Sequence, residues 1–176
     1  MKNSCLFFLL VICFSCSKIE PRRPINPKTS TTLYKETIKE AIALNRVENE
    51  KISQLIKKDS TNVYIQSSNG FWYTYINKIE GDLPKPVKGN EVTLEYNITD
   101  LKDSILYSKQ NLGVKKYIVD KEDFISGLQK GIKLMKIGET ITFVIPSYSA
   151  FGITGDGNKI GLNKSIKSTV TLINIK

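Results

Sequence analysis

The sequence predicts an α+β fold in which a mostly antiparallel, twisted sheet wraps around a short helix, with a long amphipathic helix in front of the sheet. Three observations support this expectation. Residues 33–58 carry an apolar stripe at helical spacing, alternating apolar and polar residues begin near residue 63, and a short helical segment lies between strands within residues 127–152. With 176 residues and 40% hydrophobic content, one main domain with appendages is expected.

The first 15 residues have the pattern of a signal peptide. One lysine precedes an apolar run over residues 6–14, which is too short for a permanent membrane span. The run leads to Cys16 in a sequence similar to a bacterial lipobox, although Cys13 stands where Leu, Val or Ile is usual. We therefore expect cleavage before Cys16 and lipidation of its thiol, which would anchor the chain to a bacterial membrane in the periplasm. The alternative is a plain signal peptide that is cut at another small residue.

Between this front end and the main domain we expect a disordered tether over residues 16–32 and a helical stem over residues 33–60. Serine and threonine residues can cap the start of the helix, and the sequence Asp-Ser-Thr-Asn ends it. The stripe is too weak for a long coiled coil, so the helix either packs on its own domain or binds a partner. We expect the helix to be dispensable for catalysis. The stripe consists of Ile38, Ala41, Ile42, Ile52, Leu55 and Ile56.

Residues 61–176 are expected to form the main domain. In the last predicted strand, Val170, Leu172 and, loosely, Asn174 fall on one side. Val92, Leu94, Tyr96 and Ile98 share a face of an earlier strand. Strands are predicted at residues 70–76, 91–98, 105–107, 117–119, 141–145 and 168–175.

The composition excludes several kinds of site. The chain has no histidine, and its three cysteines, Cys5, Cys13 and Cys16, all lie at the front. Histidine triads, most zinc sites and a thiolate nucleophile in the main domain are therefore excluded, and we expect neither a metal nor a cofactor. The net charge of +9 comes from scattered lysines without aromatic–basic interleaving, which is typical of a solvated surface. We expect no nucleic-acid partner.

The most informative run, GLQKGIKLMKIGETITFVIPSYSAFG over residues 127–152, combines a short helix, a tight turn, a buried strand and a returning loop. It resembles the central block of the FKBP-type peptidyl-prolyl isomerases, a resemblance that extends over residues 81–176. The block contains a helix with Gly-x-x-x-Gly, then Met-x-x-Gly, a strand, Ile-Pro and Ala-aromatic-Gly. These landmarks stand at Phe124, Ile125, Gly127, Gly131, Met135, Gly138, Ile145, Pro146, Ala150, Phe151 and Gly152.

The resemblance implies an isomerase that needs no acid, base or cofactor, and it implies which residues form its pocket. Several of them depart from the family. Tyr107 replaces the pocket aspartate, Phe151 lacks the hydroxyl of the flap tyrosine, Leu128 stands for the floor tryptophan, and Ser168 stands for an aromatic. By position, the catalytic residues are Tyr96, Phe124, Ile125, Leu128 and Phe151, and the substrate-binding residues are Leu106, Tyr107, Ile160 and Ser168.

A narrower resemblance is to the gliding-motility-associated FKBP-type lipoproteins of gliding bacteria. It rests on the lipobox, the charged helix, the Gly-Phe-Trp-Tyr strand over residues 70–73, Leu106-Tyr107-Ser108 and the flap sequence Lys159-Ile160-Gly161-x-Asn163. That family implies a role in folding envelope motility or secretion proteins, with proline-containing segments as substrates. Two alternatives remain, which are a peptide-binding chaperone without catalysis and a structural module that docks a partner through its helix.

Overall fold

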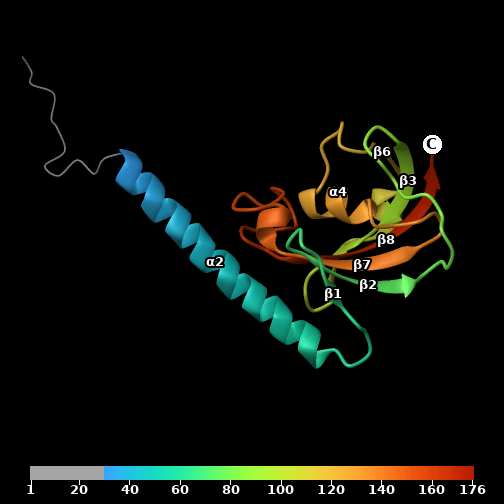
Figure 1. The fold of residues 1–176 in the computed structure, drawn as a ribbon. Coiled ribbons are helices and arrows are strands. Elements are labelled where there is room, and N and C mark those ends of the chain that lie inside the picture. The colour runs from blue at the N-terminus through green and yellow to red at the C-terminus, as the bar shows by residue number, and fades with distance from the viewer. Residues whose placement is uncertain (1–29) are drawn as a thin grey trace, which may run out of the picture. The chain divides into compact units, whose positions relative to one another are not determined.

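The computed structural model describes residues 30–176 (Figure 1). The expected signal peptide, Cys16 and most of the expected tether lie outside the described residues. Contacts within the chain define two compact units, residues 1–39 and 40–176. In the first unit the described residues are the beginning of helix α2 (Ser30–Lys58), where Leu33 and Tyr34 are exposed.

The predicted helix over residues 33–58 is confirmed, and in the second unit the C-terminal half of α2 packs on the domain. Ile52 is fully buried against Trp72 and Val144. Ile42 and Leu55, which belong to the predicted stripe, are exposed. The apolar contacts of the second half of the helix with the domain are therefore made by Ile52 and Ile56, one turn apart.

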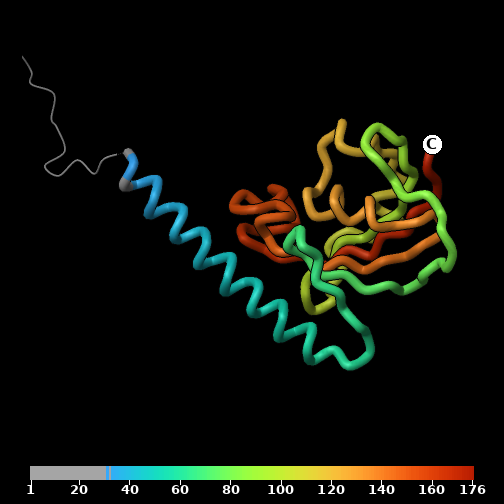
Figure 2. The backbone as a smooth tube through the Cα atoms, in the orientation of Figure 1, coloured from blue at the N-terminus to red at the C-terminus, as the bar shows by residue number. Residues whose placement is uncertain are grey.

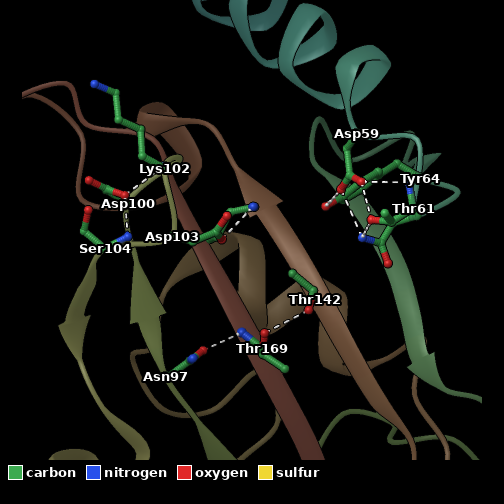
Figure 3. Close-up of polar contacts among 12 residues, drawn as sticks. Asp59, Thr61, Tyr64, Asn97, Asp100, Lys102, Asp103, Ser104, Thr142 and Thr169 are labelled. Carbon is green, nitrogen blue, oxygen red and sulfur yellow. Dashed lines mark hydrogen bonds and ion pairs between the residues drawn. The ribbon is translucent and has the colours of Figure 1, made fainter.

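The turn after α2 is fixed by the carboxylate of Asp59 (Figure 3). Asp59 accepts hydrogen bonds from the hydroxyl and the N–H of Thr61, from the Asn62 amide at 3.0 Å and from the Tyr64 hydroxyl at 3.2 Å. The bonds from Thr61 and Asn62 hold the pKa of Asp59 well below its usual range. Burial, reinforced by the charge of Asp59, raises the pKa of Tyr64 to about 12.

The rest of the second unit contains a twisted antiparallel sheet, visible in Figures 1 and 2. The strand order β1-β2-β7-β8-β3-β6 places the last two strands of the chain, β7 and β8, at the centre of the sheet. The short strand β4 (Ile98–Thr99) pairs with both β5 (Ile105–Tyr107) and β8. The other strands are β1 (Ile65–Gln66), β2 (Trp72–Asn77), β3 (Glu91–Tyr96), β6 (Lys115–Ile118), β7 (Thr140–Ile145) and β8 (Ile166–Ile175).

The two faces of the sheet carry different helices. Side chains alternate between faces along a strand, so Phe143 of β7 belongs to the main core while Val144 contacts Ile52 of α2. Helix α4 (Ser126–Ile132) lies on the main-core face, where Leu128 and Ile132 are fully buried (Figure 1). These two residues are four apart on the helix and therefore point the same way.

Helix α4 approaches β7 closely because its two glycines have no side chains. A Cβ atom on Gly127 would lie 2.5 Å from Cγ2 of Ile145, and one on Gly131 would lie 2.6 Å from Cε1 of Phe143. Both distances are too short for real carbon atoms. The Gly-x-x-x-Gly spacing of the sequence thus positions the helix against the sheet, and with it the loop that enters the helix.

The turn before β7 depends on a buried carboxylate. Glu139 is 1% exposed and accepts hydrogen bonds from the N–H groups of Lys136 at 2.8 Å and of Ile79 at 3.1 Å. The Lys136 ammonium donates to the carbonyls of Ile79 and Gly81. The Lys-Ile-Gly-Glu turn is therefore bonded to the loop that follows β2.

Two details of the strands differ from the sequence prediction. The strand predicted at 91–98 is interrupted at Asn97, whose side chain accepts a hydrogen bond from the N–H of Thr169 at 2.8 Å (Figure 3). The expectation that Asn174 shares a face with Leu172 is wrong. The pairing of β3 with β8 shifts by one residue between Thr93 and Leu94, so Asn174 is exposed and Ile175 packs against the core.

Candidate active site

A cavity of about 480 Å³ opens where the ends of β3 and β5 meet the loop that enters α4. The segment between β7 and β8, residues 146–165, forms another wall, and we call it the flap. The volume falls within the usual range for small-ligand and peptide-side-chain pockets. The lining residues are Tyr96, Ile98, Tyr107, Leu112, Lys115, Asp123, Phe124, Ile125, Ala150, Phe151 and Asp156.

Phe124 is the aromatic centre of this cavity. Its ring meets that of Tyr96 edge-on, with centroids 5.4 Å apart, and it packs at 5.3 Å against the fully buried Tyr117. The backbone carbonyl of Phe124 accepts a hydrogen bond from the Gln129 side chain at 3.0 Å, which ties the loop to α4. Burial raises the pKa of Tyr96, so this side chain stays a neutral hydroxyl at neutral pH.

The flap is bonded to β5 across the cavity through Tyr107 and Asp156. The Tyr107 hydroxyl donates a hydrogen bond to the Asp156 carboxylate. Asp156 also accepts from the N–H groups of Asn158 at 2.9 Å and Ile160 at 2.8 Å. Burial alone would raise the pKa of Asp156, but the bonds from Tyr107 and the two N–H groups outweigh it and lower the pKa. The same hydrogen bond raises the pKa of Tyr107.

Two lysines lie over aromatic rings at the cavity. The Lys115 ammonium stands 5.4 Å from the centroid of Phe124, and the Lys159 ammonium stands 5.2 Å from that of Tyr107. Charged ammonium groups therefore lie beside the largely apolar walls of the cavity.

The structure brings together five of the nine predicted site residues around this cavity: Tyr96, Tyr107, Phe124, Ile125 and Phe151. Their catalytic and binding roles stay predictions.

The other four predicted site residues do not line this cavity, and their roles also stay predictions. Leu128 and Ile160 are buried in the core, and Leu106 packs against it. Ser168 is fully buried and donates its hydroxyl to the carbonyl of Asn97 at 2.7 Å, which gives this carbonyl, between β3 and β4, a hydrogen-bond partner. Leu128 misses the cavity because it lies on the sheet-facing side of α4, together with Ile132.

The sequence prediction missed six lining residues as site residues. Ile98 could have been predicted from the sequence, because the alternating pattern of the strand places it on the same face as Tyr96. Leu112 lies on the short helix α3 (Lys109–Leu112), whose N-cap Ser108 accepts a hydrogen bond from the N–H of Asn111 at 3.2 Å. Asp156 lies in the flap, and its contact with Tyr107 joins residues 49 positions apart, so it leaves no local pattern in the sequence. The remaining missed residues are Lys115, Asp123 and Ala150.

Within residues 30–176, no group of three or more His, Cys, Asp or Glu side chains is arranged to hold a metal ion. Over the same residues, no helix has the length and apolar character needed to cross a membrane.

Comparison with known proteins identifies the family. A model of the FKBP-type peptidyl-prolyl cis-trans isomerases matches residues 83–173, which is more than half of the chain. A probable FKBP-type peptidyl-prolyl cis-trans isomerase, FkpA, of Neisseria meningitidis serogroup B is 35% identical over 98 residues. That match covers 54% of this chain and 35% of the relative, so the chain spans only about a third of that protein's length.

Solved structures share the fold. FkpA from Escherichia coli superposes with a TM-score of 0.61 at 20% identity, covering 100% of this chain and 82% of that one. A peptidyl-prolyl cis-trans isomerase from Pseudomonas syringae gives a TM-score of 0.59 at 21% identity, covering 76% of this chain and 94% of that one. The matched residues 83–173 contain every residue that lines the cavity. The chain belongs to the FKBP-type peptidyl-prolyl cis-trans isomerase family.

Proposed function

We propose that the chain catalyses cis–trans isomerisation of X–Pro bonds in exported or envelope proteins. The observation that carries this proposal is the aromatic, apolar cavity of about 480 Å³ inside the region that matches the family. Family membership supplies the reaction, and the five predicted residues around the cavity supply a place for the proline ring.

The chemistry requires no nucleophile. The barrier to rotation about the X–Pro bond arises from amide resonance, and the uncatalysed exchange takes tens of seconds or more. A twisted amide is less polar than a planar one, so an apolar pocket around Phe124 favours the twisted form relative to water. Ile125 is the N-cap of α4, and the N–H of an N-cap residue is not used within the helix. The Ile125 N–H would donate a hydrogen bond to the substrate carbonyl.

The test is a protease-coupled assay on X–Pro peptides with the full chain. The proposal expects acceleration of the slow cis–trans phase, with loss of that acceleration in Phe124→Ala. Circular dichroism of the variant controls for folding, because Phe124 also packs on Tyr96 and Tyr117. Slow phases that match the uncatalysed rate at every enzyme concentration would contradict the proposal.

A second candidate function is peptide binding without catalysis. A groove of about 710 Å³ lies between α2 and the flap, and its lining includes the exposed side chains of Leu44, Val47 and Ile153. Apolar surface of this kind is typical of sites that hold unfolded segments. Suppression of aggregation of an unfolded client, retained in a Phe124→Ala protein and lost in Val47→Asp, would favour this function over isomerisation.

We further infer that the protein is a lipoprotein of the bacterial envelope and serves the motility or secretion apparatus of a gliding bacterium. The apolar run before Cys16 and the flap sequence at residues 159–163 support this proposal. Deletion of the gene in its host, followed by a surface-spreading assay, tests the cellular role. Normal spreading and normal levels of surface motility proteins in the deletion strain would contradict it.

A further inference from the structure

One carboxylate of helix α2 contacts both ends of the flap. Glu48 accepts hydrogen bonds from the N–H and the hydroxyl of Ser147, each at 2.8 Å, and from the hydroxyl of Ser165. Ser147 begins η2 (Ser147–Ser149), immediately after Pro146, and Ser165 is the last residue before β8. The partners lie 99 and 117 positions from Glu48 in the sequence.

A chain of hydrogen bonds connects this carboxylate to the cavity. The carbonyl of Ser147 accepts from the N–H of Ala150 at 2.9 Å and from the N–H of Gly152 at 2.8 Å. These two residues flank Phe151 in the sequence, and both Ala150 and Phe151 line the cavity. The position of Ser147 therefore determines where the backbone around Phe151 lies.

The bonds to Glu48 are of the kind that holds a loop in place. A carboxylate that accepts from an N–H or a hydroxyl makes a charge-assisted bond, roughly twice as strong as a neutral one. Glu48 is half-buried and Ser147 is buried, which limits competition from water. A neighbouring contact adds to the attachment, since the Tyr148 hydroxyl lies 3.2 Å from the Asn49 side chain.

We propose that Glu48 is a positioning residue of the isomerase site, holding the flap so that Phe151 forms a wall of the proline cavity. The proposal rests on the proposed isomerase function. It also replaces the expectation that the helix is dispensable for catalysis, because a chain that starts near Val63 would lack Glu48 and leave both ends of the flap without this partner.

The test compares Glu48→Ala with Glu50→Ala in the full chain. Glu50 lies two residues further along the same helix, is exposed and forms an ion pair with Arg46 at 3.8 Å. We expect Glu48→Ala to lower kcat/KM on X–Pro peptides about tenfold, which is ~1.4 kcal/mol, chiefly through KM, because a displaced wall weakens ground-state and transition-state binding alike. Glu50→Ala should match the wild type. Glu48→Gln should restore most of the activity, since its amide oxygen can still accept from Ser147.

A second measurement keeps the proposal testable without catalysis. Amide hydrogen exchange at Ser147, Ala150 and Gly152 should accelerate in Glu48→Ala and remain unchanged in Glu50→Ala. If Glu48→Ala does not fold, Ser165→Ala removes only one of the three bonds and should show the same exchange pattern to a smaller degree. A folded Glu48→Ala protein with wild-type kcat/KM, or with unchanged exchange at these amides, would overturn the proposal. An inactive wild type would instead reject the isomerase function, and the exchange data would still decide the role of Glu48.

Discussion

Replacing Gly127 by alanine tests how the sequence positions the active-site loop. The added Cβ would lie 2.5 Å from Cγ2 of Ile145, about 0.9 Å inside the 3.4 Å at which ordinary contact begins. Ile145 is fully buried in β7, and its branched Cγ2 cannot rotate away without meeting other core atoms. Helix α4 must therefore move outward, and Ile125, two residues before Gly127, must move with it.

The loss of stability expected for Gly127→Ala can be estimated. Overpacking of this kind typically destabilises a protein by about 1–3 kcal/mol, and the better helix propensity of alanine offsets at most about 1 kcal/mol of that loss. We expect a net loss of roughly 1–2 kcal/mol in the free energy of unfolding, or a fall in Tm of about 2–8 °C. Because Ile125 lines the cavity, kcat/KM on X–Pro peptides should fall as well.

A matched control separates crowding from any general effect of alanine. At Gly161 the nearest atom to an added Cβ is Cγ of Lys164 at 3.9 Å, and the backbone is not in the left-handed region. Gly161→Ala should therefore stay within about 0.5 kcal/mol of the wild type in urea unfolding. Equal urea midpoints for Gly127→Ala and Gly161→Ala would show that α4 and β7 accommodate the added methyl group without loss of stability. The explanation of the position of α4 by its glycines would then be wrong.

Further predictions follow from the flap, the core and the front of the chain. Phe151→Tyr adds a hydroxyl that can bond the substrate carbonyl, worth about 0.5–1.5 kcal/mol, so kcat/KM should rise by up to about tenfold in the protease-coupled assay. Ser168→Ala should reduce the free energy of unfolding by about 1 kcal/mol through loss of its bond to Asn97, with kcat/KM unchanged; a large loss of activity would restore Ser168 to the site. The pKa of Asp156 is lower in the folded protein than in the unfolded chain, so its contribution to stability is complete above the unfolded value of 3.8 and disappears as the pH falls through the folded pKa. Asp156→Asn should remove that part of the stability loss on acidification below about pH 4, measured by urea unfolding. Cys16→Ser should move the protein from the membrane fraction to the soluble fraction, and a variant that stays membrane-bound would exclude the lipid anchor.

The elements that could be predicted from the sequence are those with a pattern among nearby residues. The helix over residues 33–58 and the strand before Pro146 follow from apolar periodicity, and the glycines of α4 are explained by their contacts with Ile145 and Phe143. The aromatic centre of the cavity could also be located, because Phe124 and Ile125 belong to a compact sequence block. Side chains that fill a helix–sheet interface and side chains that face a cavity are equally apolar, so Leu128 could not be assigned to the core from sequence.

The unpredictable part consists of polar contacts between distant segments. A glutamate in a charged helix has the same pattern whether it faces water or, like Glu48, binds Ser147 and Ser165. The register shift in β8 is equally hidden, because one extra residue in a strand leaves the alternation intact on either side of it. Such contacts depend on how the chain closes in space, for which a single sequence carries no periodic signal.

The replacement of the family's pocket aspartate by Tyr107 leaves a carboxylate at the cavity, supplied by the flap. An aspartate on β5 would be fixed by the sheet, whereas Asp156 belongs to the flap and lines the cavity where it accepts a hydrogen bond from Tyr107. The flap therefore has one carboxylate contact near its middle, through Asp156, and another at its two ends, through Glu48. If both contacts order the same segment, Tyr107→Phe and Glu48→Ala should not act independently on kcat/KM. Their double variant should lose less than the product of the two single losses, because a flap already released at its ends has little order left for Tyr107 to maintain. Strictly multiplicative losses would mean that the two contacts control separate parts of the flap.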